Sequence, residues 1–175
     1  MRVVLETDRL RLREIGPEDL DFLAELLGDP DVMRFYPDTL DRAATGRWLK
    51  RQLDRYRRDG HGFWMVEHRE TGQALGQVGL LNQHLGSDVY PEVAYLIHVP
   101  YQRRGFATEA ALAVRDHAFD VLGKPYVVSF IRPDNVPSQK VAWKLGMKPD
   151  GMIQWADLDH ILFQVERGGG GPESR

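Results

Sequence analysis

The sequence of 175 residues contains no cysteine, which excludes disulfides, cysteine zinc sites and a thiolate nucleophile. None of its serines lies in a Gly-x-Ser-x-Gly elbow, the turn that exposes the nucleophile of many hydrolases. The six histidines include no His-Glu-x-x-His pair, so the sequence gives no reason to expect a catalytic metal. If the protein transfers a group, we expect direct transfer between two bound molecules, without a cysteine-bound intermediate.

Long apolar runs and an excess of one charge are also missing. The longest apolar runs, residues 93–97 and 110–114, fall far short of the roughly 20 residues that a membrane-spanning helix needs. Glu6 and Asp8 interrupt the N-terminal region, where a secretory signal would need apolar residues. The 23 basic and 26 acidic side chains give a net charge of −3, which argues against a nucleic-acid surface. We therefore expect a cytoplasmic protein without a membrane or nucleic-acid partner.

The length of the chain favours a single domain with a hydrophobic core of its own. Hydrophobic residues make up 42% and charged residues 28% of the sequence, which is the mixture of an ordinary globular protein. Residues 1–167 are assigned to one domain, because no linker-like composition interrupts them. Residues 168–175 contain four glycines and a proline, and we expect them to form a flexible tail.

Apolar residues with strand-like and helix-like periods locate the expected elements. Strands are expected at residues 9–13, 63–67, 74–81, 92–99, 126–131, 152–155 and 161–166. Helices are expected at residues 17–27, 41–58, 105–122 and 136–145. Consecutive strands imply antiparallel pairs, and the strand-helix-strand unit over residues 92–131 implies one parallel pair. The predicted fold is α+β in α/β/α layers, with a mixed, mostly antiparallel twisted sheet of about seven strands and about four helices.

The segment from residue 100 to 108 lies between a predicted strand and a predicted helix and suits an anion. The first N–H groups of a helix have no partner within the helix, and the helix dipole is positive there. Gly105 lets the backbone approach a ligand, while Arg103 and Arg104 add positive charge for a phosphate. The spacing fits neither a dinucleotide fingerprint nor a P-loop. From these residues alone, a phosphate cradle and an ordinary turn with surface arginines both stay open.

Four stretches, in this order along the chain, resemble the GNAT acetyltransferases over residues 3 to 166. LETDRLRLR at residues 5–13, followed by PED, resembles the RimJ/RimL branch, the ribosomal-protein N-terminal acetyltransferases. EVAYLIHVPY from residue 92 resembles the central strand of the family, and Q-x-x-G-x-A at residues 102–107 resembles its pyrophosphate-binding motif. N-x-x-S at residues 135–138, followed by KLGM, resembles its next signature.

The resemblance implies that the protein binds acetyl-CoA and needs no metal. In this family the central strand splays from its neighbour near a bulge, and free backbone groups then pair with pantetheine like an added strand. Asn135 would contact the pantetheine arm, and Ser138 would lie near the sulfur. The residues implied in cofactor binding are Ile97, His98, Val99, Gln102, Arg103, Arg104, Gly105, Phe106, Ala107, Thr108, Asn135 and Ser138.

The implied reaction is direct attack of a primary amine on the thioester in a ternary complex. Glu92 is our candidate base, acting directly or through water, and a carboxylate at the surface end of a strand is the alternative. Ser138 is the candidate proton donor to the thiolate, and a serine that only caps a helix is the alternative. A backbone N–H near Ile97 or Val99 could stabilise the oxyanion.

One departure from the family pattern affects the catalytic residues. Many GNAT enzymes have a tyrosine seven residues after the asparagine, whereas this sequence has Ala142 there. This difference suits the RimJ/RimL branch, but it leaves open a non-catalytic module that only binds acyl-CoA. His98 and His160 are alternative bases, and a structural histidine is the competing interpretation of each.

The acceptor is expected to be a protein N-terminal amine, because the start of the chain resembles the RimJ/RimL branch. A small amine, such as a polyamine, an aminoglycoside or an amino acid, is the alternative. The arginines of residues 51–58 favour a solvated helix face, with a contact to RNA or to an acidic partner as the second interpretation. Asp88, Glu92, Asp157 and Asp159 would favour a cationic amine if they converge. A homodimer is compatible with the sequence.

Overall fold

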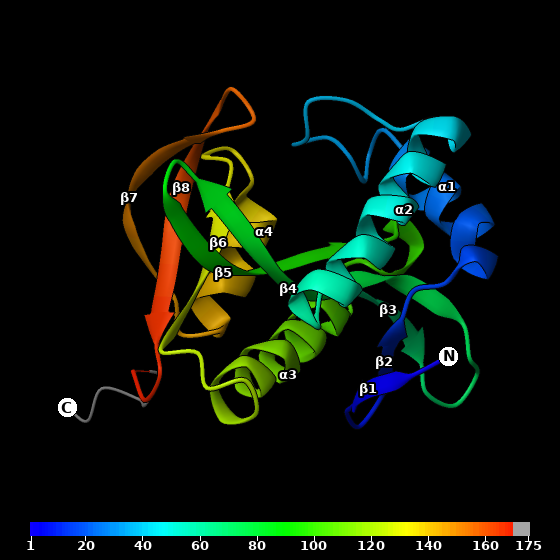
Figure 1. Ribbon diagram of the computed structural model, residues 1–175, viewed down its shortest axis with the longest axis horizontal. Coiled ribbons are helices and arrows are strands. Elements are labelled where there is room, and N and C mark those ends of the chain that lie inside the picture. Colours follow the sequence, from blue (N-terminus) through cyan, green and yellow to red (C-terminus); the bar gives the residue numbers. More distant parts are fainter. Residues whose placement is uncertain (170–175) are drawn as a thin grey trace.

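Eight strands form one mixed sheet in the computed structural model, which describes residues 1–169 (Figure 1). The strands are β1 (Val3–Glu6), β2 (Leu10–Glu14), β3 (Phe63–His68), β4 (Ala74–Leu85), β5 (Asp88–Ile97), β6 (Tyr126–Ile131), β7 (Lys148–Trp155) and β8 (Leu158–Glu166). The helices are η1 (Pro17–Asp19), α1 (Leu20–Gly28), α2 (Arg42–Asp59), η2 (Val99–Tyr101), α3 (Phe106–Asp120) and α4 (Val136–Lys144), of which η1 and η2 are 3-10 helices. Residues 170–175 of the expected tail lie outside the described residues. No helix among the described residues is long and apolar enough to cross a membrane.

The sheet confirms the predicted fold class, with strand order β1-β2-β3-β4-β5-β6-β8-β7 and a single parallel pair, β5 with β6. The expected number of about seven strands was too low by one, because β1 was missed. This strand pairs with β2 through Val3 and Arg13, Leu5 and Leu12, and Glu6 and Arg11. Its four residues are too few to display an alternating pattern, so their strand structure depends on the neighbouring strand.

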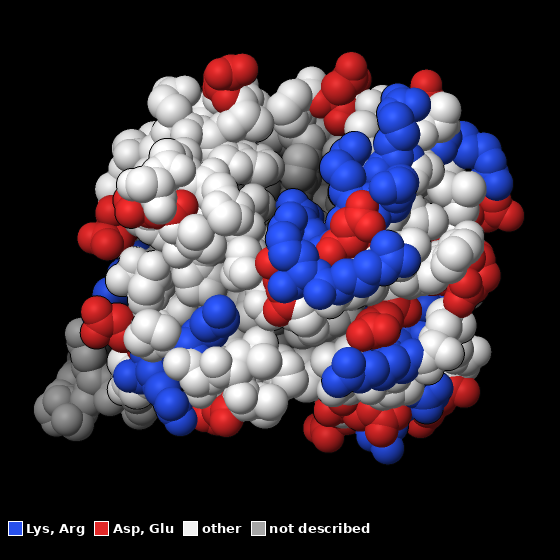
Figure 2. Space-filling model, in the orientation of Figure 1, with Lys and Arg blue, Asp and Glu red and all other residues white. Residues whose placement is uncertain are grey.

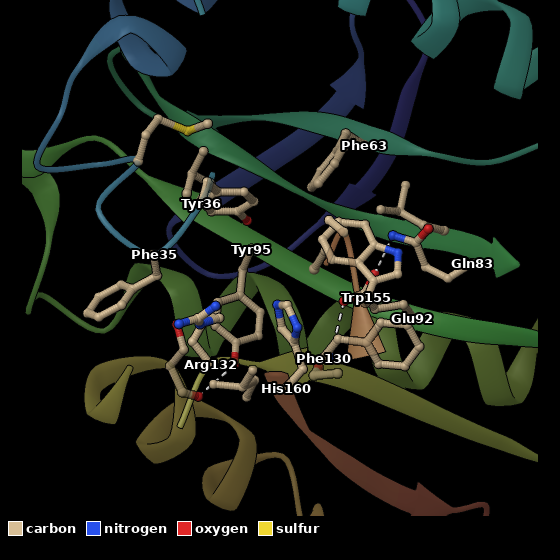
Figure 3. A pocket seen from close by; sticks show the side chains of 18 of the residues that line it. Phe35, Tyr36, Phe63, Gln83, Glu92, Tyr95, Phe130, Arg132, Trp155 and His160 are labelled. Carbon is tan, nitrogen blue, oxygen red and sulfur yellow. Dashed lines mark hydrogen bonds between the residues drawn. The ribbon is translucent and has the colours of Figure 1, made fainter. Parts of the chain in front are cut away.

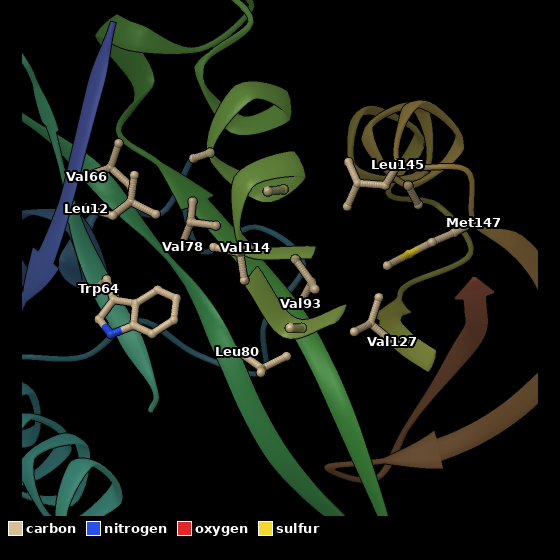
Figure 4. Close-up of a cluster of buried hydrophobic side chains, with 14 of the residues drawn as sticks. Leu12, Trp64, Val66, Val78, Leu80, Val93, Val114, Val127, Leu145 and Met147 are labelled. Atoms are coloured by element: carbon tan, nitrogen blue, oxygen red, sulfur yellow. The ribbon is translucent and has the colours of Figure 1, made fainter. Parts of the chain in front are cut away.

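Helices cover both faces of the sheet (Figure 1). Helix α3 buries small side chains, including Ala110 and Ala111, which let it lie close against β4 and β5. Figure 4 shows Val114 of α3 and Leu145 after α4 on the same side as Val93 and Val127 of the sheet. Helices α1 and α2 pack on the opposite face. The alternation of side chains along each strand therefore sends one set toward α3 and α4 and the next toward α1 and α2.

The helical spacing of Ala44, Trp48, Leu53 and Tyr56 predicts that they form the buried stripe of α2, and the structure bears this out only in part. These four residues are half-buried, and Trp48, Leu53 and Tyr56 pack against the core. The residues that are buried are Thr45, Leu49 and Gln52. Thr45 can be buried because its hydroxyl donates to the Asp41 carbonyl at 2.9 Å, which satisfies its polar group. Polar residues therefore share the buried face of α2 with the apolar stripe.

Strands β5 and β6 separate after a short contact, as the resemblance implies. The only residue pair that joins them in the described sheet is Glu92 with Val128. One residue further, the Ser129 hydroxyl donates to the Val93 carbonyl at 2.6 Å. The expected bulge is absent, because the register of β4 with β5 runs without a shift along the whole of β5. The splay therefore arises where β6 leaves a regular β5.

A buried ion pair ties β2 to η1 and β3. Arg13 is 7% exposed, and its guanidinium donates to both carboxylate oxygens of Asp19 at 2.8 Å and to Glu67 at 2.7 Å. The hydrogen bond to Asp19 is the largest factor that raises the pKa of Arg13. The guanidinium therefore stays charged and depends on its carboxylate partners.

Replacing Asp19 with asparagine is expected to lower the free energy of unfolding by about 3–5 kcal/mol, because it leaves a buried cation without full compensation. Urea unfolding measures this loss. The matched control is Glu6→Gln, which breaks the more exposed ion pair with Arg11 at 3.1 Å and should change stability by less than about 1 kcal/mol. An equal loss of unfolding free energy in the two variants would contradict the conclusion that the buried ion pair of Arg13 with Asp19 stabilises the fold.

Candidate active site

A cavity of about 470 Å³ opens between the separated strands β5 and β6 and the segment that carries α1 and α2. The loop between α1 and α2 contributes Phe35 and Tyr36, and β7 contributes Trp155 (Figure 3). Helix α2 contributes Arg51 and Arg55. Aromatic walls with a few polar groups are typical of a ligand-binding site.

Glu92 is the buried carboxylate of this cavity and is only 7% exposed. The side-chain amide of Gln83 donates to Glu92 Oε2 at 2.7 Å, and the Phe130 backbone N–H donates to Oε1 at 3.2 Å (Figure 3). Burial raises the pKa of Glu92 to about 7, although these hydrogen bonds and the nearby Arg55 favour the charged form. The carboxyl group can therefore gain or lose a proton near neutral pH.

The position of Glu92 in the strand differs from the expected one. The sequence analysis placed it at the start of a strand, but β5 begins at Asp88 because the hairpin with β4 continues beyond the apolar residues. Glu92 therefore lies inside the sheet, where it cannot be a carboxylate at the surface end of a strand. Its burial comes from the loop and helices that cover this face, which strand periodicity does not reveal.

Ser138 and Asn135 lie at the start of α4, and both line the cavity. Asn135 is the helix cap, since its side-chain oxygen accepts a hydrogen bond from the Ser138 N–H at 3.2 Å. Among residues 1–169 the Ser138 hydroxyl has no hydrogen-bond partner, so it does not serve as a cap. The Ser138 carbonyl accepts from the Tyr95 hydroxyl at 2.6 Å, which ties α4 to β5. The structure thus brings Ser138 and Glu92 to one cavity.

The turn before α3 has the backbone conformation that an anion cradle requires. Arg103 and Gly105 have φ angles of 58° and 81°, in the left-handed region that glycine adopts most easily. The first backbone hydrogen bond of α3 runs from the Glu109 N–H to the Gly105 carbonyl at 3.0 Å. The N–H groups of residues 106–108 are consequently not used within the helix and suit a pyrophosphate.

A side-chain network from the N-terminal hairpin supports this turn. Arg9 donates to the Arg104 carbonyl at 3.1 Å and to Glu109 Oε2 at 2.7 Å, and the Thr7 hydroxyl donates to Glu109 Oε1 at 2.6 Å. The Arg9 guanidinium also lies over the Phe106 ring, 4.6 Å from its centre. The run at residues 5–13 was recognised as a resemblance, but its contact with the turn is visible only in the structure.

The backbone expected to pair with pantetheine is divided between β5 and the turn that follows it. β5 ends at Ile97, whose carbonyl accepts from the Gln102 side chain at 2.8 Å. The His98 N–H bonds to the Leu75 carbonyl at 2.9 Å, and Val99 begins η2. Beyond Val93, the open edge of β5 therefore consists of the N–H and C=O groups of every second residue, including Tyr95, because these groups point toward β6.

The two histidines considered as bases have different surroundings. His98 does not line the cavity, and its Nε2 lies 3.6 Å from Glu25 Oε1 and 3.9 Å from Asp29 Oδ2. His160 lines the cavity, and its Nδ1 lies 2.9 Å from the Leu158 carbonyl, so that nitrogen carries the proton. Burial lowers the pKa of His160, which keeps it neutral. In the described part of the chain, no group of three His, Asp or Glu side chains is arranged to hold a metal ion.

Sequence reasoning missed two polar residues of the cavity. Gln83 holds Glu92 and shares its hairpin, but a glutamine in a strand carries no recognisable signal. Tyr36 comes from the loop between the first two helices. Although 37% of Tyr36 is exposed, its hydroxyl points into the cavity (Figure 3). Burial there and the nearby Glu92 raise its pKa, so it stays a protonated phenol.

The splayed sheet, the turn before α3 and the cavity beside β5 and β6 agree with a comparison against known families. A family model described as an acetyltransferase (GNAT) domain matches residues 9–148. The chain belongs to the GNAT acetyltransferase family. This acetyltransferase is 34% identical to the uncharacterized protein YkkB of Bacillus subtilis over 144 residues, which are 82% of this chain and 84% of that protein. It is therefore an N-acetyltransferase that takes its acetyl group from acetyl-CoA.

Solved structures of acetyltransferases share the fold. An acetyltransferase from Agrobacterium tumefaciens matches with a TM-score of 0.82 and 29% identity, over 93% of this chain and 94% of that one. RimL, a ribosomal L7/L12 alpha-N-protein acetyltransferase solved with coenzyme A, matches with a TM-score of 0.79 and 13% identity, over 96% and 99% of the two chains. The second likeness concerns the fold alone.

Proposed function

We propose that this acetyltransferase acetylates the N-terminal amine of a protein, by direct attack on acetyl-CoA within a ternary complex. The observation that supports the proposal most is the buried Glu92 in the wall of a cavity that opens where β5 and β6 separate. Holding amine and thioester together in one site supplies about 7–11 kcal/mol of the rate advantage. No covalent enzyme intermediate is needed.

Acetyl-CoA supplies an activated thioester, and the chain offers one place for its phosphates and another for its pantetheine arm. The cradle at residues 103–108 presents backbone N–H groups and Arg103 and Arg104 to the two phosphates. The open edge of β5, with Asn135 across the gap, presents backbone and amide groups to pantetheine. Ser138 faces the same cavity as these groups.

The residues of the cavity divide the proton transfers between them. Glu92 accepts a proton from the amine, directly or through water, because its pKa of about 7 is matched to that task. A backbone N–H of the open edge of β5 stabilises the oxyanion. Ser138 donates a proton to the leaving sulfur, which is compatible with its free hydroxyl.

Replacing Ser138 with alanine is expected to lower kcat by roughly 10–100-fold, because a positioned proton donor is lost. The KM for acetyl-CoA should change by less than about twofold. Steady-state release of coenzyme A measures both constants. Ser87→Ala, in the exposed turn between β4 and β5, is the matched control and should leave both unchanged. An unaltered kcat in the Ser138 variant would show that its hydroxyl takes no part in the reaction.

The assignment of the acceptor rests on the start of the chain and on the open side of the cavity. The run at residues 5–13 resembles the RimJ/RimL branch, and RimL acts on a protein N-terminus. Release of coenzyme A should be compared with short peptides, spermidine, an aminoglycoside and free amino acids as acceptors. We expect turnover with peptides. Turnover with the small amines alone would show that the acceptor is a small amine and not a protein N-terminus. Binding of acetyl-CoA without turnover of any acceptor would indicate a non-catalytic module.

A further inference from the structure

Two arginines of α2 face the cavity without a carboxylate partner. Arg51 and Arg55 both line the cavity, and within residues 1–169 neither forms an ion pair or a hydrogen bond. By contrast, Arg57 pairs with Asp54 at 3.0 Å and Arg58 pairs with Asp59 at 2.7 Å. Figure 2 shows Lys and Arg side chains gathered over α2 beside the hollow of this face. The paired arginines of this helix thus lie outside the cavity.

Arg55 is the deeper of the two, because it is half-buried whereas Arg51 is exposed. Burial lowers the pKa of Arg55 and the positive charge of Arg58 adds to this effect, while the carboxylates of Asp59 and Glu92 oppose it without forming an ion pair with Arg55. A half-buried cation whose N–H groups have no hydrogen-bonded carboxylate gains from a ligand that supplies one. The position therefore suits an anion that enters with the substrate.

The remaining cavity residues make this part of the site more positive. Arg132 lines the cavity, and its Nε and Nη1 are buried with no hydrogen-bond partner, the nearest carboxylate being that of Asp134 at 3.9 Å. The acidic residues of the lining are Asp38 and Glu92, against the three arginines Arg51, Arg55 and Arg132. Of the carboxylates that the sequence analysis considered for a cationic amine, Glu92 lines the cavity, whereas Asp88, Asp157 and Asp159 do not.

The phosphates of coenzyme A do not account for these arginines. The cradle at residues 103–108 shares no residue with the cavity lining. It lies before α3, whereas Arg51 and Arg55 belong to α2 on the opposite face of the sheet (Figure 1). A guanidinium binds a carboxylate or a phosphate through paired N–H groups. Since the phosphates of coenzyme A are assigned to the cradle, the acceptor is the substrate that would carry this anionic group.

We propose that the acceptor amine carries an anionic group close to the amine, and that Arg55 and Arg51 bind this group while Glu92 faces the amine. This inference rests on the proposed acetyl transfer and narrows its substrate class. The anion can come from an acidic side chain near a peptide N-terminus or from the carboxylate of a small amino acid. In both cases the arginines select the acceptor and do not touch the transferred acetyl group.

Matched acceptors that differ only in charge test the inference. The peptide pair is Ser-Glu-Ala-Ala-Ala-amide and Ser-Gln-Ala-Ala-Ala-amide, and the small-amine pair is β-alanine and β-alaninamide. The wild type should prefer the charged member of at least one pair by roughly 10–100-fold in kcat/KM, as expected for a hydrogen bond to a charged group. The pair that shows the preference identifies the source of the anion.

Three variants assign the preference to residues. Arg55→Gln should remove most of the preference, because KM for the charged acceptor should rise far more than KM for the neutral acceptor, and Arg55→Lys should keep part of the preference. Arg47→Gln is the matched control, because Arg47 is exposed on the same helix and does not line the cavity. A thermal melt of each variant shows that the fold is intact.

Calorimetry on the protein saturated with coenzyme A repeats the comparison without turnover. Equal affinity for the charged and neutral members of both pairs, or an undiminished preference in Arg55→Gln, would overturn the inference. Failure of the proposed function has a different signature, since no amine would then be acetylated whatever its charge. In that event the charge preference in binding still decides whether these arginines hold an anion.

Discussion

Replacing Glu92 with glutamine is expected to lower kcat by roughly 10²–10⁴-fold while the affinity for acetyl-CoA changes by less than about twofold. The glutamine keeps the size of the side chain, and Gln83 can turn its amide to preserve a hydrogen bond, but no group is left to accept the proton of the amine. Single-turnover kinetics and calorimetry with acetyl-CoA measure the two effects. Asp88→Asn, at the exposed start of the same strand, should behave as the wild type.

The pH dependence supplies a second test of Glu92. Its carboxylate form becomes populated as pH rises through about 7, so kcat/KM of the wild type should rise there, and the inflection should vanish in the glutamine variant. The unfolded chain loses this proton near the ordinary value of 4.5, whereas the native protein holds it until about 7. Native Glu92 therefore binds more protons between these values, and its contribution to stability falls by roughly 3 kcal/mol as pH rises.

Unfolding of the wild type and of Glu92→Gln at pH 5 and at pH 8 isolates that contribution, because other titrating groups are common to both proteins. The variant should gain stability relative to the wild type at the higher pH. A difference between the two proteins that does not change with pH, together with normal turnover, would mean that Glu92 is an ordinary buried carboxyl group without a catalytic role.

Replacing Gly105 with tryptophan is expected to weaken coenzyme A binding by roughly 100-fold or more, because it alters the cradle in two ways. At a φ of 81° a side chain strains the backbone, and a Cβ there would lie 3.3 Å from an Arg9 guanidinium nitrogen. The indole would then cover the first N–H groups of α3. Calorimetric titration with coenzyme A measures the loss.

Gly123→Trp is the matched control for this experiment. Gly123 follows the other end of α3, has a similar φ of 64°, and has open space where a Cβ would lie. It should carry a comparable backbone strain and bind coenzyme A normally. If both variants lost affinity equally, the effect would come from general strain in the region of α3, and the cradle would have no support.

The position of the turn before α3 could be predicted from sequence because its information is local. A glycine between a strand pattern and a helix pattern fixes where the helix begins, and the helix start itself presents the N–H groups. The same holds for Asn135, which caps α4 by accepting a hydrogen bond from the backbone N–H of Ser138, three positions further along the chain. Here the chemistry follows from neighbours along the chain.

The cavity could not be predicted in this way, because its walls come from segments far apart in the sequence. Strand alternation indicates that Glu92 shares a face with Ala94, but it does not say which helix covers that face. The orientation of α2 decides this, and polar residues such as Thr45 share its buried face with the expected apolar stripe. As a result Arg55 faces the cavity, although its spacing suited a solvated helix face.

The single backbone bridge between Glu92 and Val128 has a mechanical consequence. Strands β1 to β5 and strands β6 to β8 are joined in the described sheet by this one pair and by the side chains packed under α3. If the donor binds along the open edge of β5 as proposed, its amide groups would extend the main-chain hydrogen bonding from one half of the sheet toward the other.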